Sequence, residues 1–579
     1  MKVHRWLLLT SLAASLLPAL AIPSFRTKAK RNSSPFVQSD GTSFIVNGSK
    51  FRYVGTNAYW LPVLNTDEDI WNTLGNISAI GAKVIRTWAF NDVNAIPENG
   101  TWFQLVQNGT VSINEGPNGL QRLDTVIQMA QQRGLYVILS LTNNWFPQAS
   151  TSGTGTSLRT RNGSPSVTLP RNYLSNDYGS DQFQYLRCSL IVVTGGMDMY
   201  VRQFGQNYHD QFYTDQNILN AFKNFTTQVV SRYVNNPAVF SWEIANDARC
   251  ASTLPASSSC TTETVTQWHA TIAEHILSID PNHLVSSGTQ GFMCTDCPKL
   301  YPLTPPPAPQ PSPAPGTKKR SAPVTSRQIL RKRSESRRLS REAALRRGTL
   351  PQNGVRVRGR WASTATRRQQ SQGVGSSYDG SYGVDSQDIM NIPGIGFGTF
   401  QVFPDQDTYV PYDPNLSQYD NLVNQGVDWI TSQAQSASAV GKPLIMTSFG
   451  LVTQANSADF VPFNMSTAID PYGATNQQQI DAYSTWLNTS VSSNVAGMIQ
   501  YQWGQMNLTA ETGTTISPGL TGISPSPGTT GTTPSSTTTN TTQSSDTTGF
   551  SPNDGYSSNS NANGVQQVMS STAQNIASD

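Results

Sequence analysis

Charge, histidine and cysteine are all scarce in this 579-residue sequence. Charged residues make up 13%, and histidine and cysteine occur five times each. Only one Cys-x-x-Cys pair is present, Cys294 with Cys297, and no second pair or histidine cluster accompanies it, so a local disulfide is favoured over a zinc site. Neither a Gly-rich phosphate loop after a strand nor a G-x-S-x-G elbow occurs. We therefore expect no metal, no cofactor and no serine-hydrolase chemistry.

Long hydrophobic runs are absent beyond the N-terminus. Lys2, His4 and Arg5 precede an apolar run that ends at Ala19-Leu20-Ala21. A run of that length before a small-x-small site is typical of a cleaved signal peptide, here residues 1–21. No later run is long enough to cross a bilayer. These patterns predict a secreted, extracellular protein with no membrane association.

Secretion permits disulfides and glycosylation. Cys250 and Cys260 are spaced to close a loop by a disulfide, which leaves Cys188 as the odd cysteine. Twelve Asn-x-Ser/Thr sequons, Asn108 and Asn224 among them, suit a glycosylated extracellular protein.

The net charge of +3 is concentrated in one segment. Residues 317–370 hold 17 of the 39 basic residues and 2 of the 36 acidic ones, so the remainder has a net charge of −12. The wider stretch 301–375 is Pro-rich and basic and is predicted to be a disordered insertion. Polyanion binding and processing at dibasic sites are the alternatives to a merely solvated insert. We expect no nucleic-acid partner.

Two further stretches interrupt the chain. Residues 180–194 carry Cys188 and an apolar run out of phase with its surroundings, and we interpret them as a retained intron. Residues 509–550 are rich in Ser and Thr, as in O-glycosylated segments, and 551–579 are predicted to hold a turn and a last helix.

Strand-like and helix-like patterns alternate over residues 36–508. This alternation predicts a parallel sheet, and eight strands predict a closed (β/α)₈ TIM barrel of the α/β class. Helical patterns cover residues 66–81, 119–133, 217–233 and 261–279. Strand patterns cover residues 51–60, 83–92, 136–143, 239–244, 283–289, 395–403, 443–450 and 497–504.

The fourth strand pattern carries the most informative residues. A buried run from Val239 ends in Asn246-Asp247. Barrel enzymes place their chemistry at the C-terminal ends of strands, so Asp247 is a candidate acid. Glu243 lies four residues earlier, inside the strand, and we expect it to be structural and to point away from the cleft.

These residues, with Ile85-Arg86-Thr87-Trp88 and Gly195-Gly196-Met197, resemble the fungal endo-β-1,4-mannanases of glycoside hydrolase family 5. The resemblance implies a (β/α)₈ barrel with a retaining mechanism, in which two glutamates about 5–5.5 Å apart act as acid/base and nucleophile. Asp247 stands in the acid/base position and Ser448 in the nucleophile position. Arg86 and Asn246 match the family.

Other family positions are also altered. Thr289 and Gln290 replace acidic residues, Gln401 and Phe403 replace a histidine and a tyrosine, and Tyr501 replaces a tryptophan. Candidate residues for stacking on sugar rings are Trp60, Trp145 and Trp503.

The resemblance predicts a monomeric hydrolase of β-1,4-mannan or a related polysaccharide. A serine has no charge with which to stabilise an oxocarbenium-like centre, and a shortened acid is displaced by about one bond length. The alternative is therefore a catalytically inactive barrel that binds cell-wall polysaccharide.

Overall fold

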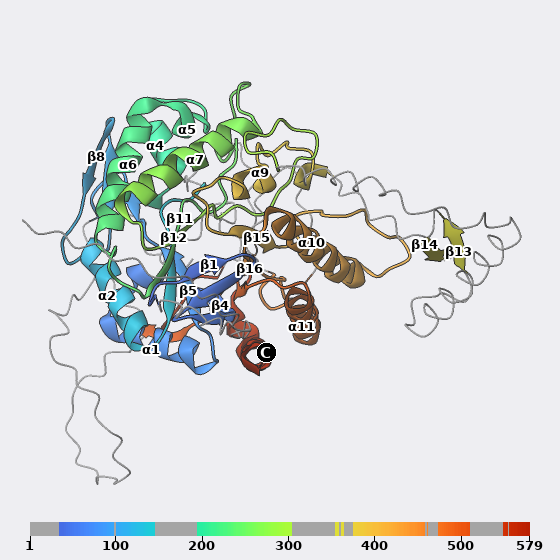
Figure 1. Cartoon of the computed structure of the whole chain (residues 1–579). Coiled ribbons are helices and arrows are strands. Elements are labelled where there is room, and N and C mark those ends of the chain that lie inside the picture. The colour runs from blue at the N-terminus through green and yellow to red at the C-terminus, as the bar shows by residue number, and fades with distance from the viewer. Residues whose placement is uncertain are drawn as a thin grey trace, which may run out of the picture.

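The computed structural model describes residues 34–97, 100–144, 194–303, 354–357, 360–363, 375–457, 460, 473–509, 548–553 and 555–578. Its centre is an eight-stranded parallel sheet, in the spatial order β12-β11-β9-β5-β4-β17-β16-β15 (Figure 1). The strands are β4 (Tyr53–Asn57), β5 (Val84–Trp88), β9 (Tyr136–Ser140), β11 (Val239–Glu243), β12 (Leu284–Ser286), β15 (Gly398–Val402), β16 (Leu444–Phe449) and β17 (Gly497–Gln500).

The two edge strands of this sheet meet and close it. Ser286 at the end of β12 forms a parallel bridge with Phe397, next to β15. The Gly396 N–H also donates to the Val285 carbonyl at 2.7 Å. The predicted (β/α)₈ TIM barrel is therefore confirmed, and every strand lies within a range that the sequence pattern predicted.

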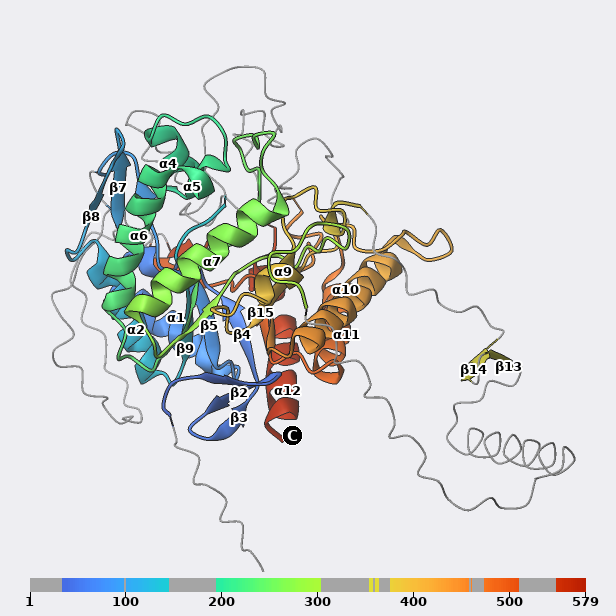
Figure 2. The same ribbon diagram turned by 45° about the horizontal axis from the view of Figure 1, so that its top comes forward.

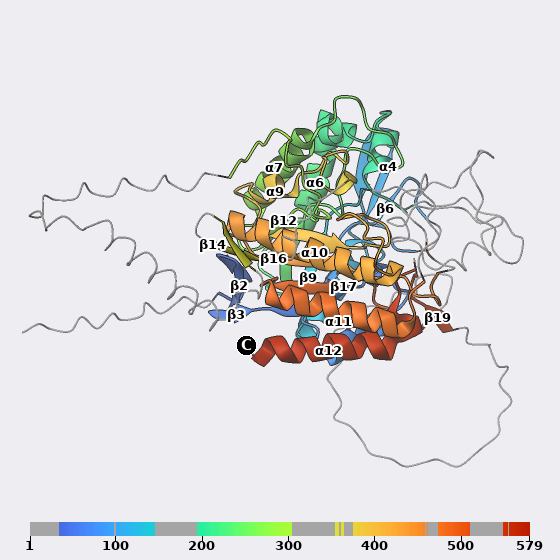
Figure 3. The same cartoon turned by 90° about the vertical axis from the view of Figure 1, so that its right-hand side faces the viewer.

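Helices cover the outside of the barrel. The long ones are α1 (Asp67–Ala79), α2 (Leu120–Gln132), α6 (Gln216–Ser231), α7 (Thr262–Ile279), α10 (Gln418–Val440), α11 (Asn476–Ser492) and α12 (Ala562–Ser578), and the last three lie side by side (Figure 3). Shorter ones are α4 (Met197–Gln203), α5 (Gln211–Thr214), α9 (Ser386–Met390), and the 3₁₀ turns η1 (Leu61–Val63), η3 (Gly375–Ser377) and η4 (Ser558–Asn561). None of the helices that the structure describes is long and apolar enough to cross a bilayer.

Local capping explains several helix boundaries. The Thr66 side chain accepts a hydrogen bond from the Asp69 N–H at the start of α1, and Asp215 caps α6 in the same way. The helix α10 is capped after Val440 by Gly441, whose φ of +78° favours glycine.

The N-terminal end of the barrel is closed by an apolar plug. The antiparallel strands β1 (Gln38–Asp40), β2 (Ser43–Val46) and β3 (Ser49–Phe51) lie across this end, opposite α4 and α5 (Figure 2). Phe44 packs edge-on against Phe240 and Phe397, with ring centroids 5.1 and 5.3 Å apart. A polar site is therefore expected at the opposite end of the barrel, where the strands have their C-terminal ends.

Smaller strands decorate the loops. A four-stranded sheet joins β10 (Thr194–Gly195), β6 (Asp92–Val93), β7 (Gln104–Gln107) and β8 (Thr110–Ile113). Two-stranded pairs are β13 (Gly354–Val357) with β14 (Arg360–Ser363), and β18 (Met506–Thr509) with β19 (Thr548–Phe550).

The predicted insertions lie mostly outside the described residues. Residues 1–21, most of 180–194 with Cys188, and most of 509–550 fall outside them, as does 301–375 apart from its ends and the β13–β14 hairpin. The residues that flank 301–375 are fastened together. The Met293 N–H donates to Ser377, and the Asn391 amide donates to the carbonyl of Tyr301 at 2.9 Å.

Disulfides join Cys250 to Cys260 and Cys294 to Cys297. Within the described ranges, no group of three or more His, Cys, Asp or Glu side chains is arranged to hold a metal ion.

Candidate active site

Arg86 organises the polar end of the barrel. It is 1% exposed and projects from β5. Its Nε lies 2.9 Å from Oε2 of Glu243 on β11, and its Nη2 lies 2.5 Å from Oε1. The remaining donors reach Oδ1 of Asn57 at 3.1 Å and Oδ1 of Asn246 at 2.8 Å. One guanidinium thus joins the ends of three strands.

Glu243 is part of the barrel interior. The Ser140 hydroxyl donates to the same carboxylate oxygen that Arg86 Nη2 approaches, and Glu243 is fully buried. Gly288 packs directly against it, because a Cβ at this position would lie 2.6 Å from the Glu243 Cγ. Glu243 therefore supports the site from inside the barrel, as its place within the strand indicates.

Asp247 sits on the loop that follows β11. Its φ of +60° is in the left-handed region, which aspartate tolerates better than most residues. Its N–H donates to the Gly288 carbonyl at 3.0 Å. The Arg249 Nε lies 3.0 and 2.9 Å from its two carboxylate oxygens, and the Gln290 amide donates to it at 3.1 Å.

Arg249 is held firmly in this position. Its guanidinium lies 4.7 Å from the ring centre of Phe292 and 4.5 Å from that of Tyr382. Burial works against its charge, but the carboxylates of Asp247 and Asp407 outweigh that effect and raise the pKa of Arg249. The Asp247 carboxylate therefore faces a permanent cation.

This pairing opposes the role of a general acid. An acid must hold a proton to deliver it to a leaving group, whereas donors aimed at both carboxylate oxygens stabilise the ionised form. Asp247 is also 1% exposed. Its position after strand four matches the family site, but its surroundings favour an ion pair.

Ser448 lies on β16, and no base among the described residues is hydrogen-bonded to its hydroxyl. The hydroxyl donates to the Thr447 carbonyl at 2.7 Å and accepts from the Asn57 amide at 3.1 Å. A serine nucleophile needs a general base to take its proton, and here a backbone carbonyl accepts it instead. The local geometry gives Ser448 a structural hydrogen bond to the end of β4, on the other side of β17.

Asn246 links Arg86 to Gln401 within the site, and Asn57 links Arg86 to Ser448. Its Oδ1 accepts from Arg86 and lies 3.4 Å from the Gln401 amide. Its own amide donates to Asn143 at 3.0 Å. The structure therefore brings Arg86, Asn246, Gln401 and Ser448 into one hydrogen-bonded network. Thr289 instead accepts from the Ser386 hydroxyl.

The aromatic candidates differ in exposure. Trp60 and Trp503 are 1% and 2% exposed, and Trp145 lies outside the described residues. Tyr501 is 8% exposed and stacks on Tyr59, with ring centroids 6.2 Å apart. Stacking on sugar needs an accessible ring face, so Tyr501 is the best placed of the three described rings. Sugar binding by these residues stays a prediction.

A buried network that the sequence pattern did not reveal supports the Asp247 loop. The Nδ1 of His209 lies 2.5 Å from Asp198, and its Nε2 lies 2.8 Å from Oδ1 of Asn144. That same oxygen accepts from the Arg249 N–H at 3.0 Å. Burial alone would raise the pKa of Asp198, but His209 and two nearby hydroxyls hold it below its usual value. The network fixes the backbone that carries Arg249.

The structure thus defines a (β/α)₈ barrel with a buried polar site at the C-terminal ends of its strands. The cellulase family model, glycosyl hydrolase family 5, matches residues 46–505. The chain therefore belongs to glycosyl hydrolase family 5.

Curated relatives agree with this assignment. The chain is 28% identical over 492 residues to mannan endo-1,4-beta-mannosidase F of Aspergillus fumigatus, a match that covers 84% of this chain and 75% of the relative. It is 34% identical to mannan endo-1,4-beta-mannosidase A of Podospora anserina over 44% of this chain and 53% of that relative. Several other curated relatives are likewise matched over about half their length.

The crystal structure of the endo-1,4-beta-mannanase from Rhizomucor miehei has the same fold. It superposes with a TM-score of 0.51 at 24% identity and covers 81% of this chain and 90% of that one.

Proposed function

We propose that the protein is a secreted family 5 barrel that binds β-1,4-mannan or a related cell-wall polysaccharide and does not cleave it by the two-carboxylate mechanism. One observation carries the proposal. Asp247, in the acid/base position, is paired with Arg249 through both carboxylate oxygens, while Ser448 fills the nucleophile position. An ion-paired aspartate and a serine are both poorly suited to the parts that the two glutamates play in that mechanism.

Several features support binding of a polysaccharide at this end of the barrel. Arg86 and Asn246 match the family pattern and are held in place by hydrogen bonds. Amide side chains such as Gln401 and Asn246 can exchange hydrogen bonds with sugar hydroxyls. The relatives named as mannosidases point to β-mannan as the polysaccharide class. The disulfides and the predicted signal peptide support secretion.

Hydrolysis of β-mannan is the second candidate, and the names of the relatives favour it. Both candidate functions predict that the protein binds the polysaccharide, but only the second predicts that it cleaves it.

The test is a calorimetric titration of the secreted protein with mannohexaose. We expect measurable binding that Tyr501→Ala weakens about tenfold, which corresponds to about 1.4 kcal/mol. Tyr412→Ala is the matched control, because Tyr412 is an exposed tyrosine, 58% accessible, outside this network. Absence of binding in a folded protein would contradict both candidates and leave a scaffold role.

A further inference from the structure

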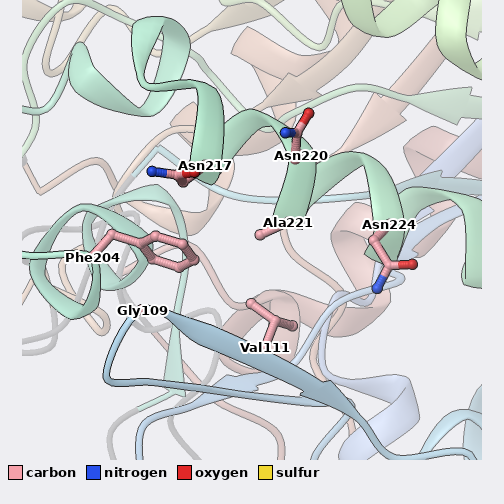
Figure 4. A pocket seen from close by; sticks show the side chains of 7 residues that line it. All are labelled: Gly109, Val111, Phe204, Asn217, Asn220, Ala221 and Asn224. Carbon is pink, nitrogen blue, oxygen red and sulfur yellow. The ribbon is translucent and has the colours of Figure 1, made fainter.

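A surface groove lies on the side of the barrel, between β8 and α6, with a volume of about 420 Å³ (Figure 4). Phe204 and Val111 give it an apolar floor. Along one wall α6 presents three amides spaced three and four residues apart, which places them on one helix face. These amides belong to Asn217, Asn220 and Asn224.

Two glycosylation sequons that are far apart in sequence meet at this groove. In the sequon Asn108-Gly109-Thr110, the first two residues form the turn between β7 and β8, and Gly109 lines the groove. Asn224-Phe225-Thr226 lies in the middle of α6, and Asn224 lines the end opposite Phe204 (Figure 4). The sequence alone gives no reason to pair them.

The first sequon has a sufficient structural explanation. Asn108 and Gly109 form a two-residue hairpin loop with φ of +51° and +73°. Such a turn favours Asn-Gly whether or not a glycan is attached.

The second sequon has no such explanation. Asparagine is a poor residue for a helix interior, and no side-chain hydrogen bond to Asn224 occurs among the described residues. Thr226 is fully buried, and its hydroxyl has no partner in the described part of the chain. Valine would fill the same space without burying an unsatisfied hydroxyl. Both residues are locally unfavourable, and both are required by the sequon.

We propose that Asn224 carries an N-linked oligosaccharide whose first sugars lie along this groove. The sugar rings cover Phe204 and Val111, and the amides of Asn217 and Asn220 hydrogen-bond to their hydroxyl groups. Asn217 and Asn224 are about 10 Å apart along the helix, so the groove can contact sugars beyond the one attached to Asn224. The proposal requires passage through a secretory pathway but is independent of mannan binding in the barrel.

Thr226→Val tests the proposal, because the direction of its shift in unfolding temperature depends on whether the glycan is present. It removes the sequon and also removes the buried hydroxyl. Made in a host without N-glycosylation, this variant should unfold at the same temperature as the unchanged protein or at a higher one. Made in a glycosylating host, it should unfold about 2 °C lower than the unchanged protein, because the glycan that covers the groove is lost.

Two matched controls isolate the effect. Thr226→Ser keeps the sequon and should keep the glycan. Asn108→Asp removes the other sequon while keeping a residue suited to the turn, and should leave the unfolding temperature unchanged. Peptide mapping by mass spectrometry reports occupancy at Asn224.

An unoccupied Asn224 would overturn the proposal, and so would a Thr226→Val variant that is stabilised in both hosts. If mannohexaose protects Phe204 from hydroxyl-radical oxidation in the unglycosylated protein while Asn224 is unoccupied in the secreted one, the groove binds a free saccharide instead. Because mannohexaose binding in the barrel is followed separately through Tyr501→Ala, failure of one proposal is distinguishable from failure of the other.

Discussion

Two buried arginine–carboxylate pairs lie at the same end of the barrel and do different work. Arg86 and Glu243 are 157 residues apart and join two strands. Arg249 and Asp247 are two residues apart on one loop, and the guanidinium lies against two aromatic rings that also contact each other. The first pair holds the barrel together at the ends of its strands. In the second pair, Arg249 binds the carboxylate of Asp247, the residue that stands in the family's acid/base position.

The comparison shows that position and surroundings contribute separately to catalysis. Asn246-Asp247 follows the fourth strand where the family pattern requires a catalytic pair. The loop nevertheless turns the aspartate toward Arg249 and Gln290. A side chain in a catalytic position is thus a catalytic residue only if its neighbours leave it able to react.

Breaking the first pair should have the largest effect. Glu243→Ala leaves the Arg86 guanidinium buried opposite an empty space. Removal of one partner of a buried ion pair typically costs about 3–5 kcal/mol, so we expect loss of that size in urea unfolding, or no secreted protein. Glu274→Ala, at an exposed position on α7, is the control and should cost little. A loss below about 1 kcal/mol for Glu243→Ala would show that the pair does not hold the barrel together.

Breaking the second pair should cost less. Arg249→Met leaves the Asp247 carboxylate with the Gln290 amide as a remaining donor, and we expect a loss of about 2–3 kcal/mol. Adding Asp247→Asn should restore at least about 1 kcal/mol, because the uncompensated charge is removed. Unfolding free energies of the four proteins in this double-mutant cycle measure the coupling. Strictly additive losses would contradict an ion pair between the two residues.

Asp92 is a further buried carboxyl group. Its hydrogen-bond donor is the side-chain amide of Gln104, whereas Glu243 and Asp247 are each paired with an arginine. Burial raises the pKa of Asp92 to about 8, although the Gln104 side chain acts in the opposite direction. The folded protein therefore keeps this proton up to about pH 8, whereas the unfolded chain loses it above about pH 4.

Stability should accordingly fall as pH rises between these values, by up to about 1.4 kcal/mol per pH unit from this group. Asp92→Asn removes the dependence, so its advantage over the unchanged protein should grow from pH 5 to pH 8 in urea unfolding. Asp481→Asn, on the exposed face of α11, is the control. A constant difference across this range would show that Asp92 is ionised in the folded state.

The basic insert should matter least. Its flanking residues are fastened to the barrel, since Leu300 and Tyr301 N–H groups donate to Asp388 and the Lys299 ammonium pairs with Asp385. Replacing residues 304–374 with a Gly/Ser linker should shift the thermal midpoint by no more than about 2 °C. A larger drop, or failure to be secreted, would mean that the insert contributes to the fold.

The sequence predicted the barrel well because its strands are distinctive. Buried parallel strands appear as short runs of β-branched and aromatic residues, and all eight were found in this way. The helices α10 and α11 were not predicted, because Ser, Gln, Asn and Thr fill much of their length and weaken the apolar pattern.

The site was predicted only in part. Arg86, Asn246 and Ser448 were grouped through the resemblance to family 5, and the structure places them together at the C-terminal ends of parallel strands. The pairing of Arg249 with Asp247 depends on a left-handed backbone at Asp247 and on rings from Phe292 and Tyr382, which lie far along the chain. The Asn-Asp-Ala-Arg spacing was the only local signal. The side chains of two residues so close in sequence can point away from each other as readily as toward each other.

The most direct test of the central claim is release of reducing ends from galactomannan by the purified protein and by the double variant Asp247→Glu with Ser448→Glu. We expect no measurable release by the unchanged protein. The double variant should show partial recovery, because Arg249 still competes for the restored acid and glutamate is less suited than aspartate to φ of +60°. Turnover by the unchanged protein that survives Asp247→Ala together with Ser448→Ala would reveal a different carboxylate at work. Turnover that these two changes abolish would show that Asp247 reacts despite its ion pair, and either result would contradict the account.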